Sequence, residues 1–473
     1  MPPGAARDRT TPRAVALDAL GRTLREDFSI EAAVDRAGID SLGEVDRGLA
    51  FELVHGVVRN RAWLDAAIGQ KARRDVQSLA PVVRDILGMA LYQVEFLDRV
   101  PDHAAVFEAV DLAKKFAPRG SDRLVNAVLR AFLRDRTVSL PDLERDPVGR
   151  LAVLHSHPAW MVRRWTSRLG QEETERLLKA NNERPPLVIR ANRLRGRRED
   201  LLKLLAESGI PSRPGAYSPD AVILDKGGPK PDRLPGWAEG LFTVQDEGAQ
   251  MISILVDPRP GERVLDACAA PGGKALHLAS LMGNKGEIVA ADPSAERLEL
   301  LRRAAERLGA SSVRPVASEA AALAERLGGG SFDRILVDAP CSGTGVLRRH
   351  PEGKWRKEEA MIGEFSARER KILSAVAPLL KTGGRLVFAT CSLEPEEGED
   401  VGPWVSEHLP GFVPVDVSSV LPSGAKGLTT PEGFLRTWPH RHGTDGFFAA
   451  VWEKREASFA GAHLGRGLGD QGR

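Results

Sequence analysis

The sequence is poor in cysteine, in long apolar runs and in net charge, and each shortage narrows what the protein can be. Three cysteines in 473 residues cannot form a disulfide framework, which favours a reducing compartment, the cytoplasm. No stretch is apolar over the length of a membrane span, and residues 1–20 contain no apolar run of the signal-peptide type. A formal net charge of +2 means that local patches have to hold any nucleic-acid partner.

The rest of the composition is that of a globular protein with several domains. Hydrophobic residues make up 42% of the chain and charged residues 28%, which is ordinary for this class. A single core rarely holds so long a chain, so two or three domains are expected. The sequence has no internal repeat, and nothing in it indicates a membrane or an obligate protein partner.

Residues 1–140 are predicted to form an all-helical bundle. Apolar residues recur at spacings of three and four between Thr11 and Arg136, as in RAVALDALGRTL and HAAVFEAVDLAKKFA, which is typical of amphipathic helices. Basic residues gather near the expected loop ends: Arg59, Arg61, Lys71, Arg73, Arg74, Lys114, Lys115 and Arg119. They belong either to solvated helix faces or to a nucleic-acid contact.

Two further regions of regular structure follow a boundary at 136–150, where RTVSLPDLERDPVG is rich in turn formers. Residues 145–240 combine helices with the short strands PLVIRAN and AVILD, which predicts a small mixed α/β module. In residues 241–455 short apolar strands alternate with long helices, and FFAAVWEK supplies a closing strand. This alternation predicts a Rossmann-like domain with a mostly parallel, doubly wound sheet. The tail, 456–473, is expected to be disordered.

The first strand end of the predicted sheet carries a glycine turn. Ligands of such sheets bind outside the carboxyl ends of the strands. In VLDACAAPGGKALHLA a strand ends at Asp266, and Gly272 and Gly273 let the backbone of the turn approach a ligand closely. A phosphate loop would need glycine at position 268 and serine or threonine at 275, where the chain has Cys268 and Ala275. A plain turn without a ligand is the remaining alternative.

An acidic residue ends the next strand, in IVAADPS. Asp292 at this place can accept hydrogen bonds from both hydroxyls of a bound ribose. It could also cap the following helix together with Ser294. Because the preceding strand ends in the glycine turn, we favour the ribose contact.

Two more strand ends, VDAPCSGTG and VFATCSLEPEEGED, each place a cysteine at the edge of the sheet. Thiols that only pack should fall inside strands or helices, so Cys341 and Cys391 are candidate nucleophiles. No metal site is expected, because the chain has no Cys-x-x-Cys pair and no histidine beside these thiols. The acidic cluster Glu394, Glu396 and Glu397 opposes a thiolate, and the spacing does not choose between the two cysteines.

LDACAAPGGK, DAPCSGTGVLRRHPEGKW and ATCSLEPEEGED resemble the motifs of the S-adenosylmethionine-dependent RNA cytosine-5 methyltransferases, the NOL1/NOP2/Sun family. The resemblance covers about residues 145–453. The helical amino-terminal part resembles the NusB RNA-binding domain, which in this family marks the enzymes of bacterial 16S ribosomal RNA. The resemblance implies S-adenosyl-L-methionine as cofactor and RNA, expected to be 16S ribosomal RNA, as partner.

The resemblance also implies roles for individual residues. Cys391 would be the nucleophile that adds to C6 of cytosine, and Cys341 would help to release the product. Asp338, beside the two thiols, fits the acid needed near N3. The donor would be held by Cys268, Ala269, Ala270, Pro271, Gly272, Gly273, Lys274, Asp292 and Asp338. The acid that normally contacts the adenine is missing from VRPVASEAAAL, where Glu319 is the expected substitute, with Ser318 beside it.

The segment RRHPEGKW is expected to contact RNA. A base splayed from single-stranded RNA needs cationic and stacking partners. The segment supplies Arg348, Arg349, His350, Lys354 and Trp355. An ordinary charged loop is the alternative. For the whole chain the alternatives are the same chemistry on transfer RNA, a non-catalytic RNA-binding adapter of ribosome assembly, and a methyltransferase of proteins or small molecules.

Overall fold

The structure, a computed structural model, describes residues 11–224, 230–327 and 329–456. Apart from residue 456, the tail predicted to be disordered lies outside the described residues. Within these ranges no helix is both long and apolar enough to cross a membrane.

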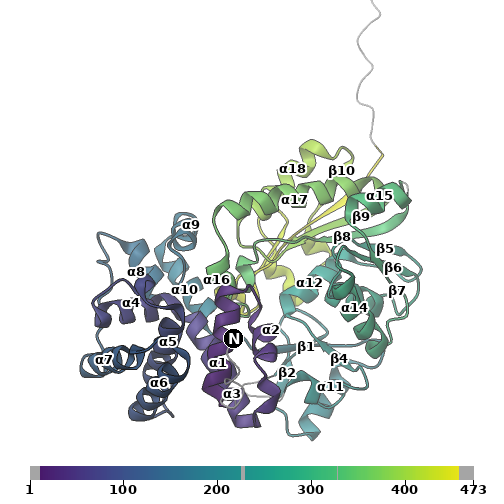
Figure 1. The fold of residues 1–473 in the computed structure, drawn as a ribbon. Helices are drawn as coiled ribbons and strands as arrows, with labels where there is room; N and C mark the ends of the chain where they lie inside the picture. The colour runs from purple at the N-terminus through teal and green to yellow at the C-terminus, as the bar shows by residue number, and fades with distance from the viewer. Residues whose placement is uncertain (1–10, 225–229, 328, 457–473) are drawn as a thin grey trace, which may run out of the picture. The chain divides into compact units, whose positions relative to one another are not determined.

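The chain forms two compact units (Figure 1). Unit 1 comprises the residues up to Pro185 together with 342–361 and 438–443. Unit 2 comprises the rest. The division falls inside the module predicted over 145–240: its residues up to Pro185, which are helical, belong to unit 1, and its strands together with the helix over 198–207 belong to unit 2. A hydrogen bond within unit 1 links the helices of this module to the amino-terminal helices: the Ala62 N–H at the start of a helix donates to Ser156 Oγ (2.7 Å).

Unit 1 is helical, as predicted for the amino-terminal region. Its helices are α1 (Pro12–Arg25), α2 (Ile30–Arg36), α3 (Glu44–Arg59), α4 (Arg61–Ala72), α5 (Pro81–Phe96), α6 (Asp102–Phe116), α7 (Ser121–Arg134), α8 (Pro147–Leu154), α9 (Ala159–Leu169), α10 (Gln171–Asn182), α16 (Gly353–Arg356) and α19 (Pro439–His442). Helix α1 begins where Thr11 caps it by accepting a hydrogen bond from the Ala14 N–H. The apolar faces of α1 to α7 meet in one core that includes Leu20, Leu53 and Phe132.

A small antiparallel sheet in unit 2 confirms both strands predicted between 186 and 225. Its order is β2-β3-β1-β4, with helix α11 between β1 and β2. The elements are β1 (Leu187–Ala191), α11 (Arg198–Glu207), β2 (Ser212–Pro214), β3 (Ala221–Leu224) and β4 (Phe242–Val244). Residues of β1, β3 and α11 share one apolar cluster around Ile189, Leu205 and Val222.

The larger sheet of unit 2 has eight strands and confirms the doubly wound prediction. The order is β10-β12-β9-β8-β5-β6-β7, and β11 pairs with β12. Strands β9 to β7 along this order are parallel, and β12, the predicted closing strand, runs antiparallel to β9. The strands are β5 (Arg263–Asp266), β6 (Glu287–Asp292), β7 (Val313–Ala317), β8 (Phe332–Asp338), β9 (Leu380–Thr390), β10 (Phe412–Val415), β11 (Leu435–Arg436) and β12 (Phe448–Lys454).

Helices cover both faces of this sheet (Figure 1). They are α12 (Glu247–Val256), α13 (Gly273–Leu281), α14 (Ala295–Leu308), α15 (Ala320–Leu327), α17 (Ala360–Val376) and α18 (Val401–His408). Alternate residues of each strand point to opposite faces, so Val264 packs with α12, α13 and α14, and Leu265 packs with α15, α17 and α18. From β5 the chain proceeds outward to β6 and β7, and from β8 it proceeds in the other direction to β9. The adjacent ends of β5 and β8 are therefore the switch point where a ligand is expected.

Candidate active site

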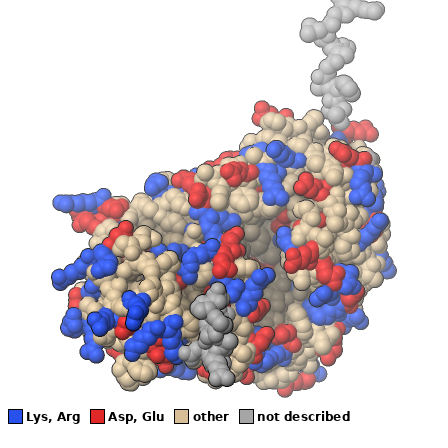
Figure 2. Space-filling model, in the orientation of Figure 1, with Lys and Arg blue, Asp and Glu red and all other residues tan. Residues whose placement is uncertain are grey.

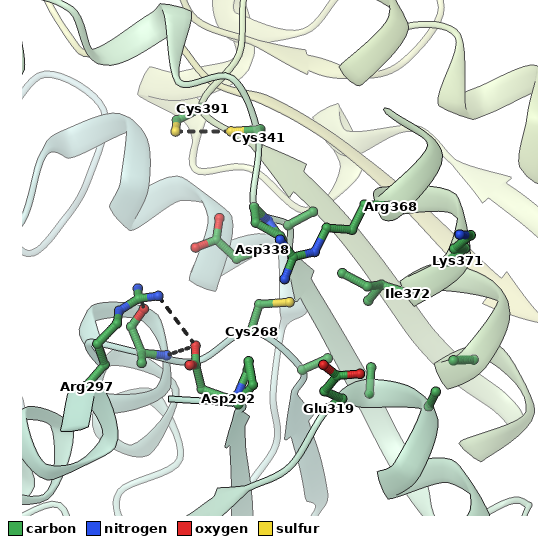
Figure 3. A pocket seen from close by; sticks show the side chains of 18 residues that line it. Cys268, Asp292, Arg297, Glu319, Asp338, Cys341, Arg368, Lys371, Ile372 and Cys391 are labelled. Carbon is green, nitrogen blue, oxygen red and sulfur yellow. Dashed lines mark hydrogen bonds and ion pairs between the residues drawn. The ribbon is translucent and has the colours of Figure 1, made fainter. Parts of the chain in front are cut away.

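The strand ends singled out in the sequence surround one cavity of unit 2 (Figure 3). Strands β5, β6, β8 and β9 are neighbours, and their carboxyl ends lie at the same edge of the sheet. The cavity measures about 440 Å³. Its lining includes Cys268, Asp292, Glu319, Asp338, Cys341 and Cys391. All six were candidates from the sequence, and the tertiary fold brings them together.

The glycine turn between β5 and α13 has the shape of a ligand cradle. Gly272 has φ +113°, and a Cβ atom there would lie 2.7 Å from Leu301 Cγ, so the position requires glycine. The turn presents Cys268 and Ala270 to the cavity. Its other predicted residues shape the turn rather than line the cavity: Ala269, Pro271, Gly272 and Gly273.

Lys274 and Asp338 form an ion pair across the strand ends. Lys274 Nζ lies 2.5 Å from Asp338 Oδ2. Burial disfavours the charge of Lys274, but the neighbouring Asp338 carboxylate outweighs this and raises the pKa of the lysine. Asp266, fully enclosed at the end of β5, has its pKa raised to about 7 by burial and then by repulsion from Asp338. The Lys274 ammonium and a carboxyl group that binds its proton more tightly than usual are thus held beside the cavity.

Asp292 faces the cavity and is not the cap of the following helix. Ser294 caps α14 by accepting a hydrogen bond from the Arg297 N–H (3.3 Å). Asp292 Oδ2 accepts a hydrogen bond from the Ala270 N–H (3.3 Å), and Oδ1 accepts one from the Ser294 N–H (2.9 Å). These bonds orient the carboxylate at the mouth of β6, where a ribose contact is geometrically possible.

Of the two residues considered for the adenine contact, Glu319 lines the cavity. Ser318 is nearly buried, and its hydroxyl donates a hydrogen bond to the carbonyl oxygen of Glu319 (3.0 Å). In Figure 3 the Glu319 carboxylate lies on the same side of Cys268 as Asp292. The adenine contact of Glu319 stays a prediction that this position supports.

The two thiols at the ends of β8 and β9 touch each other. Cys341 Sγ and Cys391 Sγ lie 3.3 Å apart, which is a hydrogen bond between free thiols (Figure 3). The Cys341 S–H lowers the pKa of Cys391 below its usual value, burial opposes this, and Lys274 favours the anion. The same hydrogen bond, together with burial, raises the pKa of Cys341 well above its usual value. Of the two thiols, Cys391 is therefore the one that ionises more readily, with Cys341 as the hydrogen-bond donor to its anion.

One residue of the predicted acidic cluster opposes both thiolates. Glu397 is fully buried and raises the pKa of each thiol by repulsion. Its Oε2 accepts a hydrogen bond from Ser392 Oγ (2.6 Å), which holds the carboxylate in place behind Cys391. The Cys341 donor and Lys274 counter this repulsion at Cys391.

The segment predicted to contact RNA packs largely inside unit 1. Lys354 is fully buried, and its ammonium donates to Arg59 O (2.9 Å), Ser156 O (2.9 Å) and Asn182 Oδ1 (2.8 Å). Arg59 ends α3 and Asn182 ends α10, so the amine lies between two helix carboxyl ends, while burial and then the Arg59 charge lower its pKa well below the usual value. This enclosure contradicts the expected RNA contact of Lys354.

The neighbours of Lys354 divide into enclosed and accessible residues. Arg348 is nearly buried and donates to Gly443 O (3.0 Å), which contradicts its expected RNA contact. Trp355 packs against the core of unit 1, and its indole N–H donates to Val58 O (2.7 Å). Arg349 is half-buried and His350 is exposed, so their RNA contacts stay predictions.

The basic residues of the amino-terminal region likewise include one with a structural contact and several that are exposed. Arg59 is half-buried and donates to Arg348 O (3.3 Å), so it has a structural contact within unit 1. Lys114, Lys115 and Arg119 are exposed at the end of α6 and in the turn after it. Lysine and arginine side chains gather over the part of unit 1 that carries α6 and α7 (Figure 2). This part of the surface is therefore a better candidate for a nucleic-acid contact than the half-buried Arg59.

Sequence reasoning missed residues that shape or line the cavity. Arg368 and Lys371 of α17 line it, and nothing in the helical pattern distinguishes them from other exposed cations. Arg190 in β1 is buried, and its Nη1 donates to Gly273 O (2.8 Å) at the glycine turn and to Gln245 Oε1. The arginine within the otherwise apolar strand PLVIRAN could have indicated this contact, because a buried arginine needs hydrogen-bond partners.

Comparisons with known proteins agree with the fold and the cavity. Residues 253–453 match the family described as 16S rRNA methyltransferase RsmB/F. Residues 10–134 match the NusB family, and residues 157–230 match the ferredoxin-like domain of RsmF/B-like methyltransferases. The probable ribosomal RNA small subunit methyltransferase B of Bacillus subtilis (strain 168) is 36% identical over 454 residues, which are 94% of this chain and 99% of that protein.

Solved structures show the same architecture. The crystal structure of PH0851 matches with a TM-score of 0.80 and 29% identity, covering 94% of this chain and 99% of that one. NSun6 from Pyrococcus horikoshii, solved with SFG, matches with a TM-score of 0.54 and 23% identity, covering 62% of this chain and 97% of that one. The second likeness is one of fold.

Proposed function

Because the chain belongs to the 16S rRNA methyltransferase RsmB/F family, and is thus an S-adenosylmethionine-dependent RNA methyltransferase, we propose that it methylates C5 of a cytosine in 16S ribosomal RNA. The proposed reaction passes through a covalent bond between Cys391 and C6 of the base. The observation that carries it is the pair of thiols 3.3 Å apart, in which Cys341 donates to Cys391 at the edge of the cavity. The cytoplasm, where 16S ribosomal RNA is made, is the proposed location.

Cysteine attack comes first, because C5 of cytosine is a poor nucleophile until the ring gains electron density. The Cys391 thiolate forms a bond to C6, and the electron pair of the C5–C6 double bond moves into the ring toward N3. N3 must then gain a hydrogen bond or a proton. Asp338, which lines the cavity, can provide this hydrogen bond or proton to N3, with the Lys274 ammonium 2.5 Å away as the neighbouring positive charge.

Methyl transfer and release follow. Bound S-adenosyl-L-methionine would supply the electrophilic methyl group: C5 bonds to it while the methyl–sulfur bond breaks and its electron pair stays on the departing sulfur. A base then removes the C5 proton, the C5–C6 double bond re-forms, and the bond from C6 to Cys391 Sγ breaks. The Cys341 S–H already donates to that sulfur and can stabilise it as it leaves with its electron pair. This gives Cys341 the release role.

The chain's own residues fit the cofactor. The glycine turn gives the donor a close backbone surface, and the Asp292 carboxylate can accept from the ribose hydroxyls. Glu319 can accept from the amino group of the adenine. The three lie around one cavity with the thiols at its other side (Figure 3).

Bisulfite sequencing of ribosomal and transfer RNA from cells with and without this chain tests the proposal. A 16S cytosine that is protected from conversion only when the chain is present is the expected result. Protection lost in transfer RNA alone would move the same chemistry to another substrate. No change in either RNA, together with RNA binding by the purified chain, would favour a non-catalytic adapter.

A further inference from the structure

Helix α17 places a cation in the donor cavity that no part of the proposed mechanism uses. Arg368, Lys371 and Ile372 of this helix line the cavity. In Figure 3 the Arg368 side chain extends from α17 toward Cys268, on the side of Cys268 where Asp338 also lies, whereas Lys371 lies beyond Ile372, away from the strand ends. Of the two cations on α17, Arg368 therefore points toward the strand ends and Lys371 does not.

Most other charges of the cavity already have partners. Asp338 is held by Lys274 (2.5 Å), and Asp292 accepts two backbone N–H bonds and lies 3.9 Å from Arg297. No residue in the described part of the chain forms a hydrogen bond or an ion pair with Arg368. A guanidinium offers five N–H donors in a planar fork that matches a carboxylate. Its position therefore indicates an anionic group of the ligand.

The orientation of the donor decides which anionic group this is. If Asp292 holds the ribose and Glu319 the adenine, the nucleoside occupies their side of Cys268. The methyl group has to face C5 of the base that Cys391 holds at C6, so the sulfonium lies between the nucleoside and the thiols. The amino-acid end then extends on the side of Cys268 where Arg368 and Asp338 lie.

We propose that Arg368 binds the carboxylate of S-adenosyl-L-methionine. The assignment rests on the donor orientation proposed above and does not depend on which RNA is methylated. The donor carries positive charge on its sulfonium and ammonium groups, which the carboxylate of Asp338 at the cavity wall favours. Its one negative group needs a cation, and an arginine fork can hold it through two parallel hydrogen bonds.

Two donors that differ only in this carboxylate test the proposal on the full-length chain. S-adenosyl-L-methionine and its decarboxylated form share the adenine, ribose, sulfonium and amine. We expect Arg368→Met to weaken binding of S-adenosyl-L-methionine about tenfold, the lower end for a charge-assisted hydrogen bond, because Arg368 is exposed at the cavity rim. Binding of the decarboxylated donor should stay within about twofold. Calorimetric titration without RNA measures both affinities.

Two matched variants separate charge from geometry. Arg368→Lys keeps the charge without the fork and should lose less affinity for S-adenosyl-L-methionine than Arg368→Met does. Lys371→Met removes a cation from the same helix and should not discriminate between the two donors.

Three results would overturn the assignment. One is unchanged affinity of Arg368→Met for S-adenosyl-L-methionine, and another is equal weakening of both donors. The third is an intact donor affinity with weakened RNA binding, which would make Arg368 a phosphate contact. A wild-type chain that binds neither donor would refute the cavity assignment as a whole. A chain that discriminates as expected but does not methylate cytosine would refute the proposed function alone.

Discussion

Replacing Cys341 with alanine tests the division of labour between the two thiols. In the wild-type chain the Cys341 S–H donates to Cys391 Sγ over 3.3 Å. A hydrogen bond to a charged group contributes about 1.5–3 kcal/mol, and the lower end applies because a thiol is a weak donor. Losing about 1.5 kcal/mol changes an ionisation constant or a rate by roughly tenfold.

Two steps of the proposed reaction depend on this hydrogen bond. It lowers the pKa of Cys391, so in Cys341→Ala that pKa rises and less thiolate is present at neutral pH. Attack on the base should then slow at pH 7 and recover as the pH is raised. Release should be slowed by about tenfold at every pH, because the departing sulfur has lost its donor. At raised pH the variant should therefore accumulate the protein–RNA adduct.

A single-turnover assay with radiolabelled RNA and denaturing gels measures this accumulation. The adduct of Cys341→Ala should survive denaturation and contain a methylated base after nuclease digestion. Cys391→Ala and the double variant should form no adduct, because no nucleophile remains. Cys268→Ala removes the third cysteine, which lines the same cavity outside the thiol pair, and should not accumulate adduct.

Two outcomes would refute this reasoning. An adduct with Cys391→Ala and none with Cys341→Ala would reverse the roles of the thiols. Retained methylation with no adduct in any variant would exclude the covalent mechanism. Either result would show that the 3.3 Å contact does not set the order of events.

Three further predictions concern stability and RNA affinity. Lys354→Met should lower the free energy of unfolding by about 2–4 kcal/mol in urea titrations, because it leaves three buried acceptors without their donor, whereas Met at exposed Lys203 should have almost no effect. Asp266 has a pKa of about 7 in the folded chain and a lower one when unfolded, so its protonated form stabilises the fold and this stability is lost as the pH rises from about 4 through 7. Asp266→Asn should flatten that decline in thermal melts recorded across this range, and an unchanged slope would contradict the shift. Glutamate at both Lys114 and Lys115 should weaken RNA binding and make its salt dependence shallower, by about 0.7 in the logarithmic slope for each lost contact to single-stranded RNA, and an equal slope would place the RNA contact elsewhere.

Much of the fold could be predicted from local patterns in the sequence. Apolar spacing indicated the helices between residues 11 and 136, and the alternation of strands and helices after residue 241 indicated the doubly wound sheet with its closing strand β12. Gly272 marked the turn because only glycine tolerates its backbone angle and its contact with Leu301. The carboxyl ends of parallel neighbours share one edge, so the sequence positions of Asp292, Asp338 and Cys391 already predicted a common site.

Other features required the tertiary structure, because they depend on contacts between residues far apart in the chain. Cys341 and Cys391 are fifty positions apart, and only their hydrogen bond and the neighbouring Lys274 indicate which thiol ionises more readily. Lys354 stands in a charged segment that suggested an RNA contact, yet carbonyl and amide oxygens from three distant segments enclose it. Arg368 has no local signal, because an exposed arginine on a helix looks the same whether it faces solvent or a cavity. Sequence pattern determines which side chains reach the sheet edge, and packing across the chain decides their charge, their partners and what they face.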